Sequence, residues 1–298
     1  MDIIHENNVV ISHIDTEQYQ HKVAALDMLR LDLVHPVVSG NKWYKLRLNV
    51  LYAQDNNFKT MVTFGGGYSN HLVATAYTAR RAGLASVGIV RGKYDHLTPT
   101  LQDCINEGME LIFVTKEDYD TQTHPEWEQR LAAQFDELYI IPEGGANEWG
   151  RKGAGLISRF ITEEYTHIAL SVGSGTTLTG IRNKTNTDQI VMGFAPMKQG
   201  TYLTDHIAPH LTPEKNTNWQ LFDNWHFGGF GKWNSELIDF MNHFYHTNHI
   251  PLDIIYTSKM MYGIGQLIAQ NHFNITDKIL CIHTGGLQGN ISVKGLLY

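Results

Sequence analysis

The sequence has few cysteines and no long apolar run, and each shortage argues against a class of protein. Its two cysteines, Cys104 and Cys281, stand far apart and form no motif, which favours a reducing cytoplasm over a disulfide framework. The longest apolar stretches fall far short of the roughly 20 residues that cross a bilayer. The first six residues lack the features of a signal peptide. We therefore expect a cytoplasmic protein without a membrane partner.

Positive charge is also scarce. The 23 lysines and arginines are outnumbered by 30 aspartates and glutamates, which gives a net charge of -7. This balance argues against a nucleic-acid partner. The apolar share of 42% and the charged share of 18% are typical of a globular protein. At 298 residues the chain fits two domains or one large α/β unit.

Short apolar runs alternate with helical patterns along most of the chain. Several of these runs are apolar on both alternations, as parallel strands buried on both faces should be. Helices are expected between them, for example over 70–81 and 101–106, each followed by a glycine. Such alternation predicts an α/β fold with parallel sheets covered by helices. The strand candidates are 60–64, 86–90, 111–114, 138–141, 167–172, 190–194 and 279–283.

A glycine-rich segment at 142–150 separates the first four strand candidates from the others. We therefore predict two α/β domains: a small one over 46–150, and a large one that combines 1–45 with 151–298. The polar segment 201–218 is expected to be a loop with a short helix.

Lys42 lies at a turn where side chains tend to do chemistry. An extended stretch is expected before it at 31–36, and a helix-like run follows over 43–53. The alternative to a chemical role is that Lys42 is an ordinary solvated lysine, since most lysines are flexible point charges on the surface.

Three glycine-rich turns follow strand candidates. The first, Gly-Gly-Gly-Tyr-Ser-Asn-His at 65–71, leads into a helix, whose free N–H groups attract anions. Ser69 is also a plausible N-cap. The second, Gly-Ser-Gly-Thr-Thr at 173–177, suits a phosphate but lacks the P-loop ending and the dinucleotide-binding spacing. The third spans 283–289.

Ligands of open α/β sheets sit beyond the carboxyl ends of the strands, so these three turns could converge on one crevice. Together with Lys42 they form a site for a phosphate-bearing aldehyde, which means pyridoxal phosphate.

These motifs resemble a known family. In the same order, Gly-Asn-Lys at 40–42, the turns 65–71 and 173–177, and His-Thr-Gly-Gly at 283–286 occur in 1-aminocyclopropane-1-carboxylate deaminases and D-cysteine desulfhydrases. That family belongs to the tryptophan synthase β-like, fold-type II pyridoxal-phosphate enzymes. The similarity covers roughly 33–286, and it implies a two-domain tryptophan synthase β-like fold with the cofactor between the domains. Members are commonly homodimers.

The resemblance assigns roles to the matching residues. Lys42 would form the Schiff base with the cofactor and then move protons at the α-carbon. Lys45 would lie near the cofactor phosphate, and Asn70 would hydrogen-bond the 3-hydroxyl of the ring. Ser69, with the N–H groups of Asn70 and His71, would take the substrate carboxylate. The phosphate would be held by Gly173, Ser174, Gly175, Thr176 and Thr177.

Four further positions bear on the reaction. Tyr256 matches the family's active-site tyrosine. Thr257 and Thr284 stand where true cyclopropane deaminases carry a glutamate and a leucine, whereas desulfhydrase-like members carry hydroxyl residues at both. A neutral hydroxyl holds the ring nitrogen less protonated than a carboxylate does, which suits β-elimination better than ring opening. Phe230, expected at the substrate, departs from the tyrosine that the family usually has between Gly229 and Gly231.

The sequence thus predicts a pyridoxal-phosphate lyase of amino-acid metabolism that eliminates sulfide from D-cysteine or a related β-substituted D-amino acid. Three alternatives stay open: 1-aminocyclopropane-1-carboxylate deamination, cofactor binding without turnover, and a nucleotide-binding α/β protein. The histidines at 243, 246 and 249 recur in a probable helix, but nothing completes a ligand set, so we expect no metal.

Overall fold

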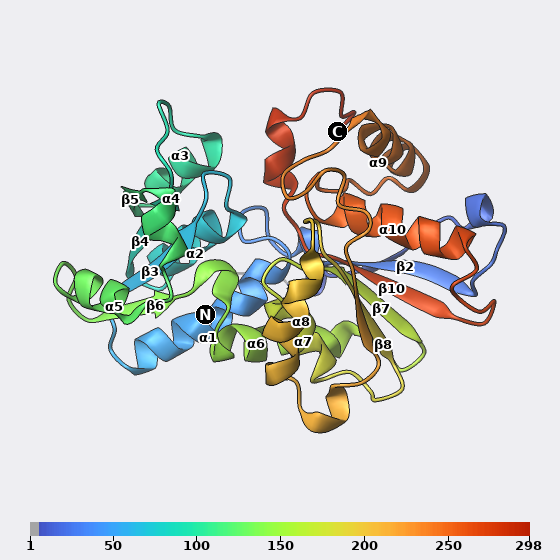
Figure 1. Cartoon of the computed structure of the whole chain (residues 1–298), viewed down its shortest axis with the longest axis horizontal. Coiled ribbons are helices and arrows are strands. Elements are labelled where there is room, and N and C mark those ends of the chain that lie inside the picture. The colour runs from blue at the N-terminus through green and yellow to red at the C-terminus, as the bar shows by residue number, and fades with distance from the viewer. Residues whose placement is uncertain (1–5) are drawn as a thin grey trace.

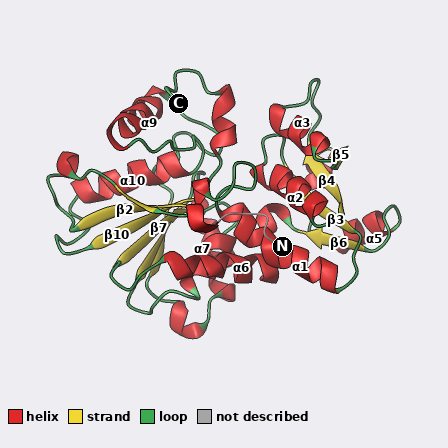
Figure 2. Cartoon of the chain, turned by 180° about the vertical axis from the view of Figure 1, so that it is seen from behind, coloured by secondary structure: helices red, strands yellow, loops and turns green. Residues whose placement is uncertain are grey.

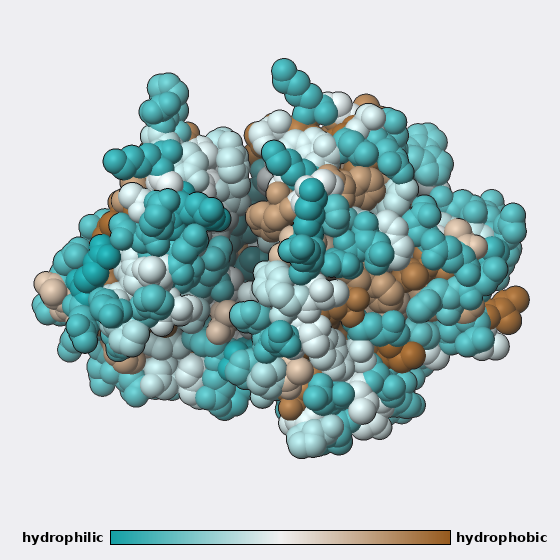
Figure 3. Space-filling model, viewed as in Figure 1, coloured by the Kyte–Doolittle hydropathy of each residue, from teal (hydrophilic) through white to brown (hydrophobic). Residues whose placement is uncertain are grey.

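The chain forms two lobes, each built around one sheet (Figure 1). This computed structural model describes residues 6–298; residues 1–5, which include most of the segment considered for a signal peptide, lie outside that part. Figure 3 shows the surface hollowed between the lobes. Within residues 6–298, no helix is both long and apolar enough to span a bilayer.

The larger sheet has six strands in the order β1-β2-β10-β7-β8-β9. Only β1 pairs antiparallel with its neighbour. Alternate residues of β10 pack into separate clusters: Leu280 and Ile282 on one face, Ile279 and Cys281 on the other. Burial on both faces explains the continuous apolar runs. The strands are β1 (Ile11–His13), β2 (Ala25–Arg30), β7 (His167–Ser171), β8 (Ile190–Phe194), β9 (Trp219–Phe222) and β10 (Lys278–His283).

Helices cover both faces of this sheet (Figure 2). One face carries α9 (Ser235–Asn248) and α10 (Thr257–Ala269). The opposite face carries α1 (Asn41–Asp55), α6 (Glu148–Gly155), α7 (Thr176–Arg182) and α8 (Leu203–Ile207). Since α1 packs against α6 and continues into the smaller lobe, it connects the two sheets.

The smaller sheet is wholly parallel, in the order β5-β4-β3-β6. Apolar residues of α2 and α3 pack together beside it, and those of α4 and α5 form a second cluster with β3 and β4. Its elements are β3 (Thr60–Gly65), α2 (Asn70–Arg81), β4 (Ala85–Arg91), α3 (Pro99–Asn106), β5 (Glu110–Val114), α4 (Lys116–Asp120), α5 (Pro125–Ala132) and β6 (Leu138–Ile141).

Short 3-10 turns complete the described chain. They are η1 (Glu6–Asn8), η2 (Glu17–Tyr19), η3 (Leu31–Leu33), η4 (Glu143–Gly145), η5 (Leu156–Phe160), η6 (Gly200–Tyr202), η7 (Ala208–His210), η8 (Pro213–Lys215) and η9 (Leu287–Ser292).

The α/β fold with mostly parallel sheets is confirmed, and each of the seven predicted strands is present. The sequence missed β1, β2 and β9. β1 is short and half-exposed, and β2 carries Asp27, which accepts a hydrogen bond from Tyr165, so neither has a clean apolar pattern. Of the stretch expected to be extended at 31–36, Leu31–Leu33 form η3 instead. The helix after it begins at Asn41, so Lys42 lies in its first turn.

Candidate functional site

The turn that carries Lys42 lies directly against the third glycine turn. Gly40 has φ 65°, and a Cβ there would stand 1.9 Å from the carbonyl oxygen of Thr284. The backbone N–H of Asn41 donates to that same oxygen at 3.3 Å. Glycine is therefore required at position 40 by both its backbone conformation and the close approach of Thr284.

Asn41 connects this turn to the second glycine turn. Its Nδ2 donates to Thr177 Oγ1 at 2.9 Å, and its Oδ1 accepts from Lys42 Nζ at 2.8 Å. The buried Asn41 amide therefore joins the lysine to the second turn, 136 residues further along the sequence.

Lys42 is half-buried. This burial lowers the pKa of Lys42 from 10.5 to about 8, and the carboxylate of Asp253 opposes the shift. An amine of this kind is partly neutral near physiological pH, which a nucleophile or base requires.

Lys45 lies one helical turn further and is buried. Its Nζ donates to the carbonyl of Gly144 at 2.8 Å, and both burial and the charge of Lys42 lower its pKa. Among the described residues no carboxylate ion-pairs with either lysine. Two adjacent lysines, one buried and one half-buried, that have no carboxylate in ion-pair contact make a site that favours a phosphate.

The contact with Gly144 was not foreseen, because the segment at 142–150 reads as a domain seam. In the structure Gly144 and Gly145 both have positive φ and reach the site: a Cβ on Gly144 would stand 3.2 Å from Ser174 Oγ, and one on Gly145 would stand 3.3 Å from Lys45. The paired glycines directly after β6 were the available signal, the same pattern as in the other turns.

The first glycine turn opens α2. Ser69 is its N-cap and accepts from the N–H of Leu72 at 3.3 Å, so the capping role is present. Asn70 follows, and its buried Oδ1 has no protein partner. A Cβ on Gly286 would stand 3.1 Å from Asn70 Nδ2, so the first and third turns lie close together.

His71 has a buried side chain with a fixed tautomer. Thr63 Oγ1 donates its only hydrogen to Ile141 O at 2.8 Å, so it must accept from His71 Nε2, 3.0 Å away. Nδ1 is therefore an unprotonated acceptor, and it has no partner. Burial, with the charges of Lys45 and Lys42, lowers the pKa of His71 from 6.5 to about 3.

The second glycine turn precedes α7. Gly175 has φ 78°, and Ser174 Oγ lies 2.9 Å from Thr176 Oγ1. The first N–H groups of α7 are free for an anion, since a helix start has no internal acceptors for them. A Cβ on Gly173 would stand 3.5 Å from the hydroxyl of Tyr256, which places that tyrosine beside the turn.

Tyr256 and Thr257 begin α10, where the buried Asp253 carboxylate accepts their two N–H groups at 2.8 and 2.7 Å. Burial and the charges of Asp253 and Glu143 raise the pKa of Tyr256 well above its usual range, so its phenol stays protonated. Thr257 Oγ1 is buried and has no partner. Asp253 is a residue that sequence reasoning missed.

Phe230 lies at the rim of the site. Its ring is exposed and meets the Tyr256 ring edge-to-face, with centroids 5.9 Å apart. Thr284, by contrast, is buried under the Lys42 turn. The structure therefore brings together residues from all of the predicted motifs.

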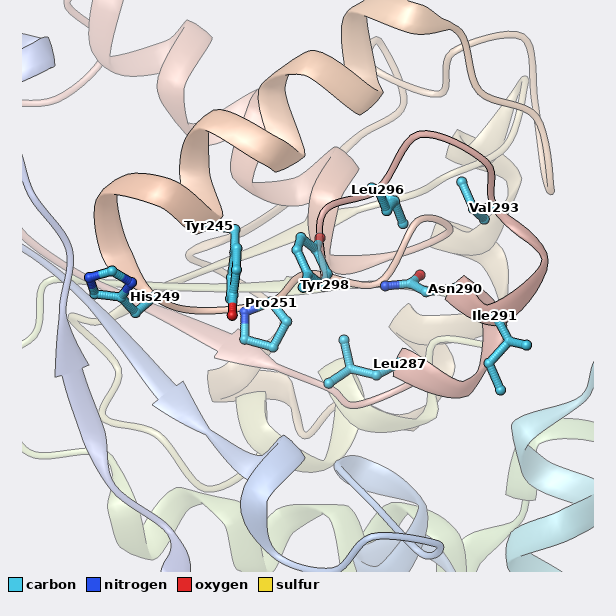
Figure 4. A pocket seen from close by; sticks show the side chains of 9 residues that line it. All are labelled: Tyr245, His249, Pro251, Leu287, Asn290, Ile291, Val293, Leu296 and Tyr298. Atoms are coloured by element: carbon cyan, nitrogen blue, oxygen red, sulfur yellow. The ribbon is translucent and has the colours of Figure 1, made fainter.

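Two other features lie outside this site. Within residues 6–298, no three histidine, cysteine or acidic side chains gather as metal ligands, and the histidines at 243, 246 and 249 lie along α9 and at its C-cap. A surface groove of about 570 Å³ runs between α9 and the C-terminal segment (Figure 4). Its lining, which includes Tyr245, Leu287 and Tyr298, holds none of the predicted site residues.

Pyridoxal phosphate would supply the interactions that the site residues lack. Lys42 and Lys45 have no anion in ion-pair contact, and the free polar atoms of Asn70 and Thr257 need hydrogen-bond partners. A phosphorylated pyridine that carries a hydroxyl and a ring nitrogen supplies both.

Comparisons with known proteins agree with a pyridoxal-phosphate site. Residues 28–285 match the family described as "Pyridoxal-phosphate dependent enzyme". A provisionally named 1-aminocyclopropane-1-carboxylate deaminase of Pyrococcus horikoshii is 28% identical over 87% of this chain and 84% of its own. A D-cysteine desulfhydrase of Salmonella typhi is also 28% identical, over 87% of this chain and 86% of its own.

Among solved structures, an ACC deaminase homologue superposes with a TM-score of 0.81 at 26% identity, over 95% of this chain and 90% of its own. A threonine deaminase of Solanum lycopersicum shares the fold, with a TM-score of 0.67 at 14% identity over 96% of this chain and 80% of its own. The family match spans most of the chain, and the site has the lysine, the anion-binding turns and the free polar atoms that the cofactor requires. The chain therefore belongs to the pyridoxal-phosphate dependent enzymes.

Proposed function

We propose that this enzyme is a lyase that eliminates sulfide from D-cysteine or a related β-substituted D-amino acid. With D-cysteine and one water molecule the products are pyruvate, ammonia and hydrogen sulfide. The Cα–H and Cβ–S bonds break, and sulfur leaves with the electron pair of its bond. The observation that carries this proposal is Lys42, an amine of lowered pKa held by Asn41 where the glycine turns meet.

When bound, pyridoxal phosphate withdraws electrons from the α-carbon of an amino acid. Lys45 and the N–H groups of the second turn would hold its phosphate. Asn70 and Thr257 offer free polar atoms to the ring, and Thr284 lies beside the Lys42 turn. The second-turn residues are Gly173, Ser174, Gly175, Thr176 and Thr177.

The substrate would be handled by residues on both sides of the hollow. Lys42 acts as the base that removes the α-proton, because its lowered pKa leaves part of it neutral. Ser69 and the N–H groups of Asn70 and His71 bind the carboxylate at the start of α2. Tyr256 keeps its proton and therefore serves as a hydrogen-bond donor beside the reacting carbons.

Thr257 favours elimination over cyclopropane ring opening. Its hydroxyl is neutral, and the nearby Asp253 carboxylate is already occupied by three backbone N–H groups. Without a carboxylate at the ring nitrogen, the cofactor ring withdraws electrons less strongly. This weaker withdrawal is still sufficient for elimination of a good leaving group. The relatives carry both names, so 1-aminocyclopropane-1-carboxylate deamination is the competing activity.

Absorption spectra test this function. Purified protein with pyridoxal phosphate should show a visible band that D-cysteine perturbs as pyruvate accumulates. Lys42→Ala should lose the band and at least about a hundredfold in rate, whereas the exposed Lys116→Ala control should keep both. Turnover of 1-aminocyclopropane-1-carboxylate instead of D-cysteine would establish the competing activity. A band that no amino acid perturbs would leave a cofactor-binding protein without turnover.

We also propose the domain division at 46–150, a homodimer and a cytoplasmic location. Support for the location comes from Cys104 and Cys281, both buried and unpaired, as thiols are in a reducing compartment. Light scattering of the purified protein should give twice the monomer mass, and a monomer mass would reject the dimer.

A further inference from the structure

Lys259 is a buried cation for which the proposed chemistry has no use. It lies in the first turn of α10 and is 2% exposed. Burial lowers its pKa to about 8, and the Asp253 carboxylate only partly opposes this. A lysine in such a place needs hydrogen-bond acceptors for all three of its protons.

Three backbone carbonyls supply those acceptors. Lys259 Nζ donates to His226 O at 2.9 Å, to Gly229 O at 3.1 Å and to Pro196 O at 3.4 Å. Two of the three acceptors belong to one short segment, residues 226–231, which we term the glycine loop. Pro196 follows β8, so the ammonium joins the loop to both α10 and the sheet.

Short-range hydrogen bonds lie within the glycine loop: the N–H of Gly229 donates to His226 O at 3.1 Å, and the N–H of Gly228 donates to His226 Nδ1 at 3.0 Å. Phe227, Gly228, Gly229 and Gly231 all have positive φ, between 51° and 124°. Backbone of this kind is costly to order, and three glycines make many other conformations accessible. The Lys259 bonds join the backbone of this loop to α10, beside the edge-to-face contact of the Phe227 ring with Tyr262.

The loop carries Phe230, whose exposed ring meets Tyr256 edge-to-face. Tyr256 is the N-cap residue of α10, and Lys259 lies three residues further on in its first turn. The lysine thus anchors the loop beside the tyrosine that its aromatic ring contacts.

We propose that Lys259 is a positioning residue: it fastens the glycine loop to α10, so that Phe230 stands against Tyr256 and closes the substrate side of the site. The inference rests on the proposed function, because it takes the Tyr256 side of the hollow as the place where substrate binds. The loop would then contribute to substrate affinity, while Lys42 and Tyr256 perform the chemistry without it.

Hydrogen exchange on the cofactor-loaded protein tests the anchor without any substrate. Lys259→Met keeps the length of the side chain and removes its donors. We expect peptides covering 226–233 to exchange at least about tenfold faster, because their opening costs less. The sheet strands and the affinity for pyridoxal phosphate should stay unchanged. Lys215→Met is the matched control, since Lys215 Nζ also donates to a backbone carbonyl, that of Thr185, outside the site.

Kinetics then separate positioning from general damage. Lys259→Met should raise KM about tenfold and leave kcat within about threefold, as loss of substrate binding predicts. Phe230→Ala should raise KM similarly, and the double variant should be no worse than either single one. Additive effects, or a parallel fall of kcat and of protection throughout the protein, would overturn the proposal.

Two further cases complete the test. If Lys259→Met fails to fold, the shorter Lys259→Gln replaces it: faster exchange of the glycine loop in that variant supports the anchor, and unchanged exchange rejects it. Faster loop exchange in a protein that does not turn over D-cysteine would reject the proposed function and retain the anchor. Unchanged loop exchange in an active enzyme would reject the anchor alone.

Discussion

At the scale of single residues, the site gathers three basic side chains that lose their protons at lower pH than usual. Lys42, Lys45 and His71 all have lowered pKa values, mainly because burial removes water from them. Lys42 also lowers the pKa of Lys45 by charge repulsion, and both lysines lower that of His71 in the same way. Chemistry and stability should therefore both depend on pH.

Cofactor loading should follow the ionisation of Lys42. The amine must be neutral to attack the aldehyde, so the loading rate should rise with pH through about 8. Asp253→Asn removes the charge that raises this pKa, and the midpoint should then move to lower pH. Stopped-flow absorbance would measure the midpoint, with the exposed Asp239→Asn as control. An upward shift for Asp253→Asn would contradict this account.

His71 should make the protein sensitive to acid. Its folded pKa of about 3 lies below the unfolded value of 6.5, so the unfolded state takes up a proton first as pH falls. Stability that is present above pH 6.5 is lost on the way down to pH 3, by a few kcal/mol, since one pKa unit is about 1.4 kcal/mol. Urea titrations should show a shallower pH dependence for His71→Gln. Equal slopes would reject the assignment.

At the scale of elements, glycines mark the places where turns from distant parts of the chain touch. Gly40 and Gly83 make a matched pair, because both have positive φ, 65° and 73°. A Cβ at Gly40 would collide with Thr284 O, whereas nothing lies within 4 Å of one at Gly83. Comparing alanine variants at these two positions therefore separates the cost of backbone strain from the cost of a steric clash between turns.

Gly83→Ala should cost about 1–2 kcal/mol, the penalty of left-handed backbone. Gly40→Ala should cost more than about 4 kcal/mol, or leave the protein unable to bind pyridoxal phosphate, because the Lys42 turn must move. Urea unfolding and cofactor titration measure the two effects. If both variants behave alike, the contact between the turns is not required.

The sequence revealed the strands and turns that have local signals. The runs at 60–64 and 279–283 are buried on both faces, and each glycine turn directly follows such a strand. It did not reveal Asp253, whose role depends on helix geometry that only the fold defines. Gly144 was read as part of a seam because its contact with Lys45 spans 99 residues. Nor could the pattern show that Phe230 rests on Tyr256.

At the scale of the whole molecule, the cofactor would lie between two lobes that α1 connects. Ligand that binds only the folded state stabilises it, by about 2.7 kcal/mol at 100 times Kd. For a chain of this size we expect the midpoint of thermal unfolding to rise by at least about 5 °C. Pyridoxal, which lacks the phosphate, should raise it less. An equal rise would show that the anion site around Lys45 adds nothing.

The two adjacent lysines have a consequence for the protein before it meets its cofactor. Lys42 and Lys45 repel each other in a place with little water, so the protein without its cofactor should bind small anions there. Inorganic phosphate and sulfate would then compete with the cofactor, and the speed of enzyme maturation would depend on the buffer. A cell that accumulates phosphate would slow the activation of newly made chains without altering a single mature one.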